Sequence, residues 1–269
     1  LEALRRILTP GRYDVVVGNP PYITVKDLRL KARYRELYSS CKGTYALSVP
    51  FMERFFQLAK RPSDDRPAGW AGQITSNSFM KREFGSKLVE DFLTAQDLRL
   101  VIDSEGAWIP GHNADGTPTV ILVGLPGAAR SSSVRSVLSK GRRETGSVGG
   151  QGAGPYWRSL LSNLGRVGHE DEWISVADVP RAAYASHPWS LSGGGAGDLL
   201  AVLDGDRERT LAKLTGDVGF MAVTREDDAY IWGESTLRRY RIDPALHGRC
   251  VPGSAVRDWG FIGTDSILC

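Results

Sequence analysis

The stretch that decides the fold is Tyr13-Asp14-Val15-Val16-Val17-Gly18-Asn19-Pro20-Pro21-Tyr22-Ile23, in which a short apolar run leads directly into a turn. The β-branched residues that end at Gly18 predict a fully buried strand, as in a parallel sheet. Asn-Pro and Pro-Pro are turn dipeptides, so the chain is expected to turn immediately after the strand. Because ligands of open α/β sheets bind beyond the carboxyl ends of the strands, this turn is a candidate binding loop.

Strand and helix patterns alternate on the carboxyl side of this stretch. Apolar runs predict further strands at residues 70–75, 98–103 and 120–123, and helical spacing of apolar residues predicts helices at 45–60 and 79–93. This alternation is typical of an α/β domain with a mainly parallel sheet.

The composition changes after the fourth expected strand. Residues 127–154 are rich in serine and glycine and contain the basic cluster Lys140, Arg142 and Arg143, which predicts a flexible connection. The remaining residues have the mixed pattern of an incomplete α+β domain.

The overall composition narrows the class of protein. The 269 residues are 41% hydrophobic and 24% charged and carry a net charge of +3, which is typical of a globular protein and compatible with nucleic acid binding. Three cysteines and four histidines are scattered without metal-site spacing, so we expect no metal and a reduced, cytoplasmic protein. No apolar run approaches the ~18 residues of a membrane helix, so we expect no membrane partner.

The turn residues carry a specific chemistry. An Asn-Pro-Pro-Tyr sequence arises by chance in such a chain with odds on the order of one in a thousand. An exocyclic amine on an aromatic ring is a poor nucleophile, and the Asn19 side-chain carbonyl and the Pro20 backbone carbonyl could hold its hydrogens. The fixed φ angles of Pro20 and Pro21 stiffen the loop, and Tyr22 offers a face for base stacking. Catalysis would then consist of positioning and hydrogen-bond electrostatics.

This sequence resembles the motif [Asn/Asp/Ser]-Pro-Pro-[Tyr/Phe/Trp] of amino-methyltransferases that use S-adenosylmethionine. The resemblance implies S-adenosyl-L-methionine as the cofactor and Asn19, Pro20, Pro21 and Tyr22 as catalytic residues. Asn-Pro-Pro-Tyr is shared by DNA adenine methyltransferases and protein-glutamine methyltransferases, so the motif alone leaves both substrates open.

Other stretches resemble DNA adenine N6-methyltransferases, in particular the phage-growth-limitation family of BREX-type phage defence. They are residues 43–56, 74–85, 108–112, 117–122, 187–191, 193–196 and 218–220. The resemblance implies methyl transfer to adenine N6 by base flipping, with double-stranded DNA and other phage-defence proteins as partners.

The same resemblance implies a domain organisation. Residues 1–128 would be the C-terminal half of a Rossmann-like methyltransferase sheet, residues 129–169 a flexible linker or an insertion, and residues 170–269 the beginning of an α+β target-recognition domain. The cofactor motifs would lie upstream of Leu1, so we expect a fragment that is inactive alone.

Trp108 aligns with an aromatic residue that, in related enzymes, packs on the flipped base opposite the tyrosine of the motif. The alternative is a core or rim position, since the chain has seven tryptophans. We hypothesise that the base is held between Tyr22 and Trp108.

Several polar residues stay ambiguous in the sequence. Lys26, Lys31, Arg33 and Arg35, like Lys81 and Arg82, could contact phosphates or form solvated helix faces. Asn77 is expected to cap the following helix. Asp103, at a strand end, is left outside the site.

Two other functions remain open. One is methylation of protein glutamine or RNA, which the length of chain after residue 123 disfavours. The other is a catalytically inactive DNA-binding fragment, which the intact motif disfavours.

Overall fold

The structure is a computed structural model, which describes residues 2–63, 65–107, 118–144, 154–191, 199, 202–203, 205, 211–214, 225–251, 255–257, 260–261 and 265–268. The chain divides into two compact units, Leu1–Gly205 and Asp206–Cys269. Trp108 lies outside the described residues, so its predicted position is not addressed by the structure.

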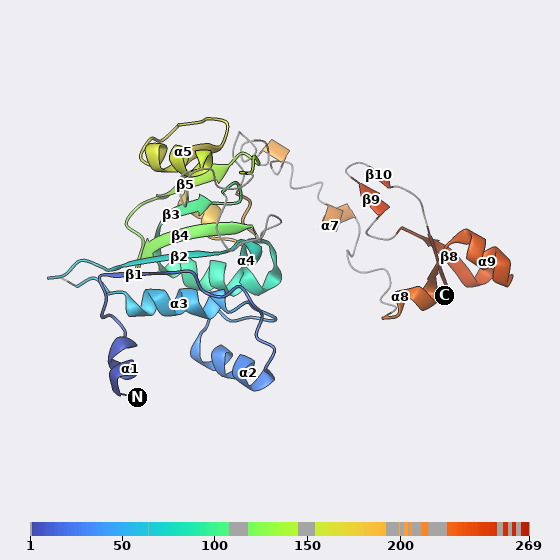
Figure 1. The fold of residues 1–269 in the computed structure, drawn as a ribbon, viewed down its shortest axis with the longest axis horizontal. Coiled ribbons are helices and arrows are strands. Elements are labelled where there is room, and N and C mark those ends of the chain that lie inside the picture. The colour runs from blue at the N-terminus through green and yellow to red at the C-terminus, as the bar shows by residue number, and fades with distance from the viewer. Residues whose placement is uncertain are drawn as a thin grey trace. The chain divides into compact units, whose positions relative to one another are not determined.

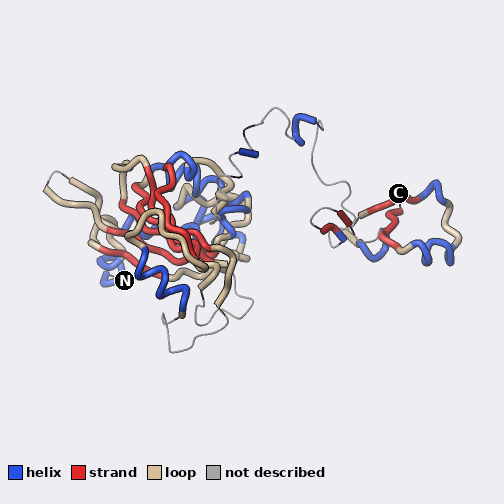
Figure 2. The backbone as a smooth tube through the Cα atoms, turned by 90° about the horizontal axis from the view of Figure 1, so that it is seen from above, coloured by secondary structure: helices blue, strands red, loops and turns tan. Residues whose placement is uncertain are grey.

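A six-stranded sheet forms the centre of the first unit (Figures 1 and 2). Its strands, in spatial order, are β1 (Val15–Gly18), β2 (Trp70–Ser76), β4 (Thr119–Leu125), β3 (Asp97–Asp103), β5 (Ser133–Ser139) and β6 (Ile174–Pro180). The pairs β1–β2 and β3–β5 are parallel, and the other three pairs are antiparallel.

The predicted strands are confirmed, but the expectation of a mainly parallel sheet is wrong. β4 inserts between β2 and β3 and runs antiparallel to both. A buried strand has the same apolar pattern in either direction, so the pattern could not reveal this reversal.

One face of the sheet is covered by α3 (Ser48–Leu58) and by the segment after β2. Met52 and Phe56 of α3 pack against buried residues such as Ala71 and Leu122 in the larger hydrophobic core. Because residues paired across neighbouring strands point to the same face, this core continues from β2 through β4 to β3.

The helix expected at residues 79–93 is broken into α4 (Ser78–Lys81), η1 (Glu83–Gly85), η2 (Leu88–Phe92) and η3 (Leu93–Ala95). Gly85 lies directly against the backbone carbonyl of Phe79, where a Cβ atom would collide. This close approach turns the chain sharply after α4, so a single continuous helix cannot form.

A second, smaller hydrophobic core lies on the opposite face. α5 (Pro155–Asn163) places Tyr156 and Leu160 against Ile102, Val137 and Val176, which form a second core over β3, β5 and β6.

Val15 and Val17, on β1, are 57% and 73% exposed, so the expectation of a fully buried strand at 12–18 is wrong for this chain. Among the described strands β1 lies at the edge of the sheet, and α3 packs on the face opposite to Val15 and Val17.

Within residues 129–169, which we expected to be a flexible linker or an insertion, the described residues include the ordered elements β5 and α5. β5 is an internal strand of the sheet, and α5 packs on it. Ser133–Ser139 (SVRSVLS) has no regular alternation of apolar and polar residues, and serines and glycines flank it, so the sequence pattern did not predict this strand.

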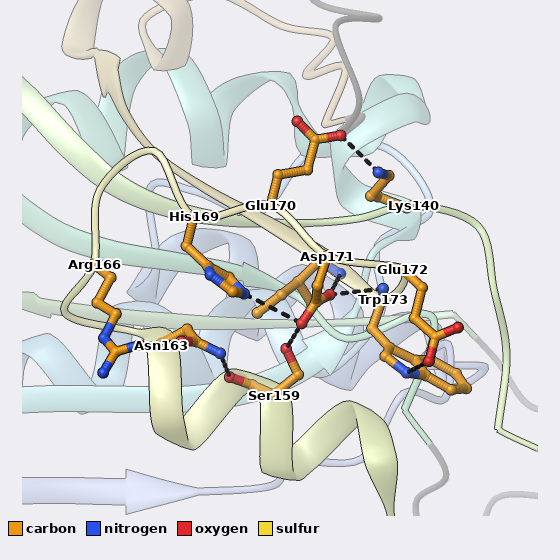
Figure 3. A network of polar contacts seen from close by, with 10 residues as sticks. Lys140, Ser159, Asn163, Arg166, His169, Glu170, Asp171, Glu172 and Trp173 are labelled. Atoms are coloured by element: carbon orange, nitrogen blue, oxygen red, sulfur yellow. Dashed lines mark hydrogen bonds and ion pairs between the residues drawn. The ribbon is translucent and has the colours of Figure 1, made fainter.

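A network of hydrogen bonds and ion pairs holds the segment between α5 and β6 in place (Figure 3). Asp171 accepts hydrogen bonds from the Ser159 hydroxyl, from His169 Nε2 at 3.2 Å, and from the backbone N–H groups of Trp173 and Ile174 at 2.8 and 2.9 Å. Burial raises the pKa of Asp171, but these hydrogen bonds outweigh it and hold the pKa below the ordinary value. The carboxylate, not the histidine, is central, so the cluster lacks the order of a nucleophilic Ser-His-Asp triad.

The end of the first unit returns to the larger core. After β6, η4 (Arg181–Tyr184) is followed by Trp189, which is 2% exposed and donates its backbone N–H to Met80 O at 2.9 Å. Residues 170–191 therefore belong to the same unit as the motif, although we expected position 170 to begin a separate domain.

The second unit is a small α+β structure. β7 (Ile231–Trp232), β11 (Asp265–Leu268) and β8 (His247–Cys250) form an antiparallel sheet in that order, and β9 (Val256–Arg257) pairs with β10 (Gly260–Phe261). Its described helices include α7 (Leu211–Leu214), α8 (Asp227–Tyr230) and α9 (Glu234–Tyr240).

Candidate active site

The Asn-Pro-Pro-Tyr motif (residues 19–22) begins immediately after β1 ends at Gly18. A Cβ atom at position 18 would lie 2.8 Å from Phe55 Cζ of α3, so a glycine lets the helix approach the strand here. Pro20 is buried, whereas Asn19 and Pro21 are exposed. The motif is therefore anchored through Pro20 and leaves the Asn19 side chain accessible to a ligand.

Backbone pairing also fixes the far side of the motif. Thr24 forms an isolated antiparallel bridge with Ala46, and Leu47 N donates to Ile23 O at 2.9 Å. The four motif residues are thus held between β1 and the start of α3, which leaves little conformational entropy to be lost on binding.

Asn19 and Tyr22 are joined by a hydrogen bond in which the Tyr22 hydroxyl donates to Asn19 Oδ1 at 2.6 Å. Burial raises the pKa of Tyr22 to about 12, so its hydroxyl stays protonated and remains a donor at neutral pH. A carbonyl oxygen has two lone pairs, so Asn19 Oδ1 can still accept a hydrogen from an amine. This contact orients the proposed acceptor, and it was not predicted from the sequence.

The carboxyl ends of β1, β2 and β3 lie at the same edge of the sheet, because these strands run in one direction. Asn77 follows β2 and occupies the N-cap position of α4, but its side chain makes no capping hydrogen bond, so that prediction is wrong. Ser76 Oγ accepts from Ser78 N at 3.2 Å instead.

Asp103 ends β3 at this edge and is 7% exposed. Burial raises the pKa of its carboxyl to about 6, although a backbone hydrogen bond from Glu105 N at 3.1 Å lowers it in part.

A cavity of about 520 Å³ adjoins the motif. Its wall contains one aromatic residue of the motif and the charged and hydroxyl side chains of two neighbouring segments; the lining residues are Tyr22, Thr24, Lys42, Gly43, Thr44, Ala46, Ser78, Arg82, Glu83 and Phe84. This volume lies within the range of small-ligand pockets.

A buried carboxyl group holds the segment that contributes Lys42 and Thr44 to this cavity. Glu53 of α3 is 6% exposed, and its Oε2 accepts from Ser40 N at 3.0 Å and from Ser40 Oγ at 2.7 Å. The sequence placed residue 53 on a helix without revealing its partner, because the contact spans 13 residues.

The basic residues after the motif differ in their contacts. Arg33 pairs with Glu36 at 2.8 Å, Arg35 donates to Gly43 O at 2.6 Å, and Lys31 Nζ lies 3.4 Å from Thr44 Oγ1. Lys26 and Lys81 are exposed. Of the cations considered in the sequence, Arg82 lines the cavity beside Tyr22.

The basic cluster at 140–143 is ion-paired in the structure. Lys140 lies 2.6 Å from Glu170, Arg142 contacts Glu172, and Arg143 contacts Glu105. Its positive charge is therefore largely balanced by acidic side chains.

Comparison with known proteins connects this site to a family. Residues 2–108, which include the motif, match the Eco57I restriction-modification methylase family. The chain is 45% identical over 264 residues, or 96% of its length, to the adenine-specific methyltransferase PglX of Streptomyces coelicolor. These similarities relate the chain to adenine-specific and restriction-modification methyltransferases. It spans about a fifth (21%) of the length of that relative.

Two further similarities are weaker. The type II methyltransferase M.BstVI of Geobacillus stearothermophilus is 30% identical over 95 residues, which cover 34% of this chain and 16% of that protein. The solved structure of the type IIL restriction-modification enzyme MmeI in complex with DNA superposes over 94% of this chain and 29% of that one, at 10% identity. The TM-score of this superposition is 0.47, which is too low to define a fold.

The proteins that this chain resembles are methyltransferases, and a methyltransferase requires a methyl donor. Within the described part of the chain, no group of three or more His, Cys, Asp and Glu side chains is placed to hold a metal ion. None of the described helices has the length and apolar character needed to cross a bilayer.

Proposed function

We propose that this chain is part of an enzyme that transfers a methyl group from S-adenosyl-L-methionine to N6 of an adenine flipped out of double-stranded DNA. The observation that carries the proposal is the Asn-Pro-Pro-Tyr motif, anchored at the carboxyl end of β1 with the Asn19 side chain exposed. The similarity to an adenine-specific methyltransferase supports adenine as the target.

In this proposal the chain's own residues position the adenine amine. The Asn19 Oδ1 and the Pro20 carbonyl oxygen each accept one hydrogen of the amino group, which favours a more nucleophilic, pyramidal nitrogen. Tyr22 orients Asn19 through its hydroxyl and offers its ring to the base. Pro20 and Pro21 keep the acceptors in place.

We assign the second face of the base to Trp108. Residue 108 follows β3 by five positions, and β3 ends at the same edge of the sheet as the motif. A base between two aromatic rings would gain about 1–3 kcal/mol per stacking face.

The described residues do not by themselves fit the methyl donor. Lys42 and Arg82 of the cavity beside Tyr22 outnumber its one carboxylate, Glu83, and would repel a positively charged sulfonium. We therefore place the donor on the other side of the motif, beyond β1.

The uncovered side of β1 supports this placement. Val15 and Val17 are largely exposed, and their neighbours Ile74 and Val123 on the same face are only half-buried. We propose that further strands and helices of a longer polypeptide complete a Rossmann-like sheet here, with this chain as its C-terminal half.

The domain boundaries are revised in the proposal. The catalytic part extends through the compact unit that ends at residue 205, and the target-recognition domain begins in the second unit. We propose a cytoplasmic enzyme of BREX-type phage defence that works with other defence proteins.

The decisive experiment measures methyl transfer by the complete polypeptide that carries this chain. We expect labelled methyl groups from S-adenosyl-L-methionine to enter duplex DNA as N6-methyladenine, and Asn19→Ala to abolish this while the protein stays folded. RNA and a glutamine-containing release-factor protein are the matched alternative substrates. Methylation of either of these instead of DNA would refute the proposal, as would DNA methylation that survives Asn19→Ala.

A further inference from the structure

The cavity beside Tyr22 has the chemistry of an anion site. Cationic and hydroxyl groups dominate its polar lining, namely Lys42, Arg82, Thr24, Thr44 and Ser78. Ammonium and guanidinium groups only donate hydrogen bonds, and hydroxyl groups can donate as well, so the ligand that suits them is an acceptor such as a phosphate oxygen.

The charges favour a ligand with a single negative charge. Lys42 and Arg82 face one carboxylate of the cavity, Glu83, and Lys31 lies next to the rim through Thr44. Glu83 pairs with Lys42 at 3.1 Å, but its side chain is 85% exposed, so solvent weakens this contact. Arg82 makes no ion pair or hydrogen bond with another side chain in the part of the chain that the structure describes.

The position of the cavity ties it to the target nucleotide. Tyr22 lines the cavity, and its hydroxyl donates to the Asn19 oxygen that would hold the adenine amine. If the target base lies at Asn19, the sugar and the flanking phosphates of the same nucleotide must lie close to Asn19 and therefore near this cavity.

We propose that this cavity seats a phosphodiester group next to the flipped adenosine, with Arg82 and Lys42 as its cationic partners. This assignment rests on the proposed function, and it deepens it by naming residues that position the DNA backbone. While DNA is absent, Glu83 forms an ion pair with Lys42. When DNA binds, the phosphate takes the place of the Glu83 carboxylate beside Lys42.

The segment around Lys42 is built to hold its position. Lys42 Nζ also contacts Ser86 Oγ at 3.1 Å, and the buried pair of Glu53 and Ser40 fixes the backbone just before it. The cation is thus presented by an ordered segment and not by a free loop, as a positioning residue requires.

The test uses the complete polypeptide and compares three charge-changing variants. Arg82→Gln should weaken duplex DNA binding about tenfold near 0.1 M salt, because one charge-assisted contact is lost. The slope of log K against log salt should become shallower by about 0.9. Glu83→Gln should act in the opposite direction, strengthening binding and steepening the slope, because it frees Lys42. The control is Arg61→Gln, an equal charge change at an exposed arginine beside a second cavity, near the opposite ends of β1 and β2.

A substrate with a neutral methylphosphonate next to the methylated adenine, once that adenine is mapped, locates the contact. The Arg82→Gln effect should disappear on this substrate, as a double-mutant cycle requires for interacting groups. Lys42→Gln provides a second variant if Arg82→Gln lowers the unfolding temperature.

The outcomes separate the two proposals. If the wild-type protein neither binds nor methylates duplex DNA, the proposed function fails. If it methylates DNA but Arg82→Gln behaves like Arg61→Gln, or Glu83→Gln weakens binding, the phosphate seat is refuted and the proposed function stands.

Discussion

The hydrogen bond between Tyr22 and Asn19 leads to a sharp prediction for Tyr22→Phe. The substitution removes the hydroxyl that donates to Asn19 Oδ1 at 2.6 Å and keeps the aromatic ring. A neutral hydrogen bond contributes about 0.5–1.5 kcal/mol, so losing it should lower kcat about 2- to 13-fold. Because Asn19 is exposed, we expect its orientation to depend on this hydrogen bond.

The ring and the hydroxyl can be separated by comparing Tyr22→Phe with Tyr22→Ala. Removal of the ring also removes stacking of about 1–3 kcal/mol, so Tyr22→Ala should weaken DNA binding as well as turnover. Single-turnover methylation by the complete polypeptide reports the chemical step, and fluorescence of 2-aminopurine at the target position reports base flipping.

The pH dependence gives a further control for the same residue. Burial raises the pKa of Tyr22 from 10.0 to about 12, so the folded protein keeps this proton as pH rises through 10. No loss of wild-type activity from Tyr22 ionisation should therefore occur below about pH 11.

If Tyr22→Phe has the wild-type rate, the hydrogen bond does not contribute. If it is as impaired as Tyr22→Ala in flipping, the division between ring and hydroxyl is wrong.

Four further predictions concern the edge and the faces of the sheet. Burial raises the pKa of Asp103 from 3.8 to about 6, so the folded state binds more protons between these values and stability should fall as pH rises from about 4 to about 6. Asp103→Asn should remove this slope and stabilise the protein at neutral pH by at most about 3 kcal/mol, as urea unfolding at both ends of the window would show. Gly18→Ala should cost about 1–3 kcal/mol because the new methyl group meets Phe55 at 2.8 Å, and Phe55→Leu should restore part of the loss in thermal unfolding. Trp108→Ala should weaken DNA binding and turnover of the complete polypeptide and leave donor binding unchanged, as calorimetry can test; unchanged DNA binding would remove Trp108 from the site. Val17→Lys should scarcely change the unfolding temperature of the 269-residue chain, where Val17 is 73% exposed, but should destabilise the complete polypeptide; equal effects would contradict a covered β1.

Local patterns predicted the strands and the motif because those features depend on neighbouring residues. The run of valines before Gly18 and the turn chemistry of residues 19–22 are both contained in one short stretch. The direction of the chain through this strand was enough to predict that the motif lies at the carboxyl end of β1.

Contacts between residues far apart in the chain could not be predicted from the sequence. Lys140 and Glu170 are 30 positions apart, so their ion pair was not foreseeable from the sequence. Lys42 was overlooked for the same reason, since the pairing of residues 23 and 24 with residues 46 and 47 brings its segment beside the motif.

The disagreement at β1 is informative in itself. Three consecutive valines are typical of a strand covered on both faces, yet Val15 and Val17 face solvent in this chain. Burial of each would contribute about 1.5 kcal/mol or more, a gain that a further layer of the same polypeptide can supply. Such a layer would also hold the exposed face of β1 in place. The position of Asn19 depends on β1, because Asn19 follows the last residue of this strand. The residues that bind the adenine and the elements that bind the methyl donor would then stabilise one another across a single strand, which is why we expect activity only from the complete polypeptide.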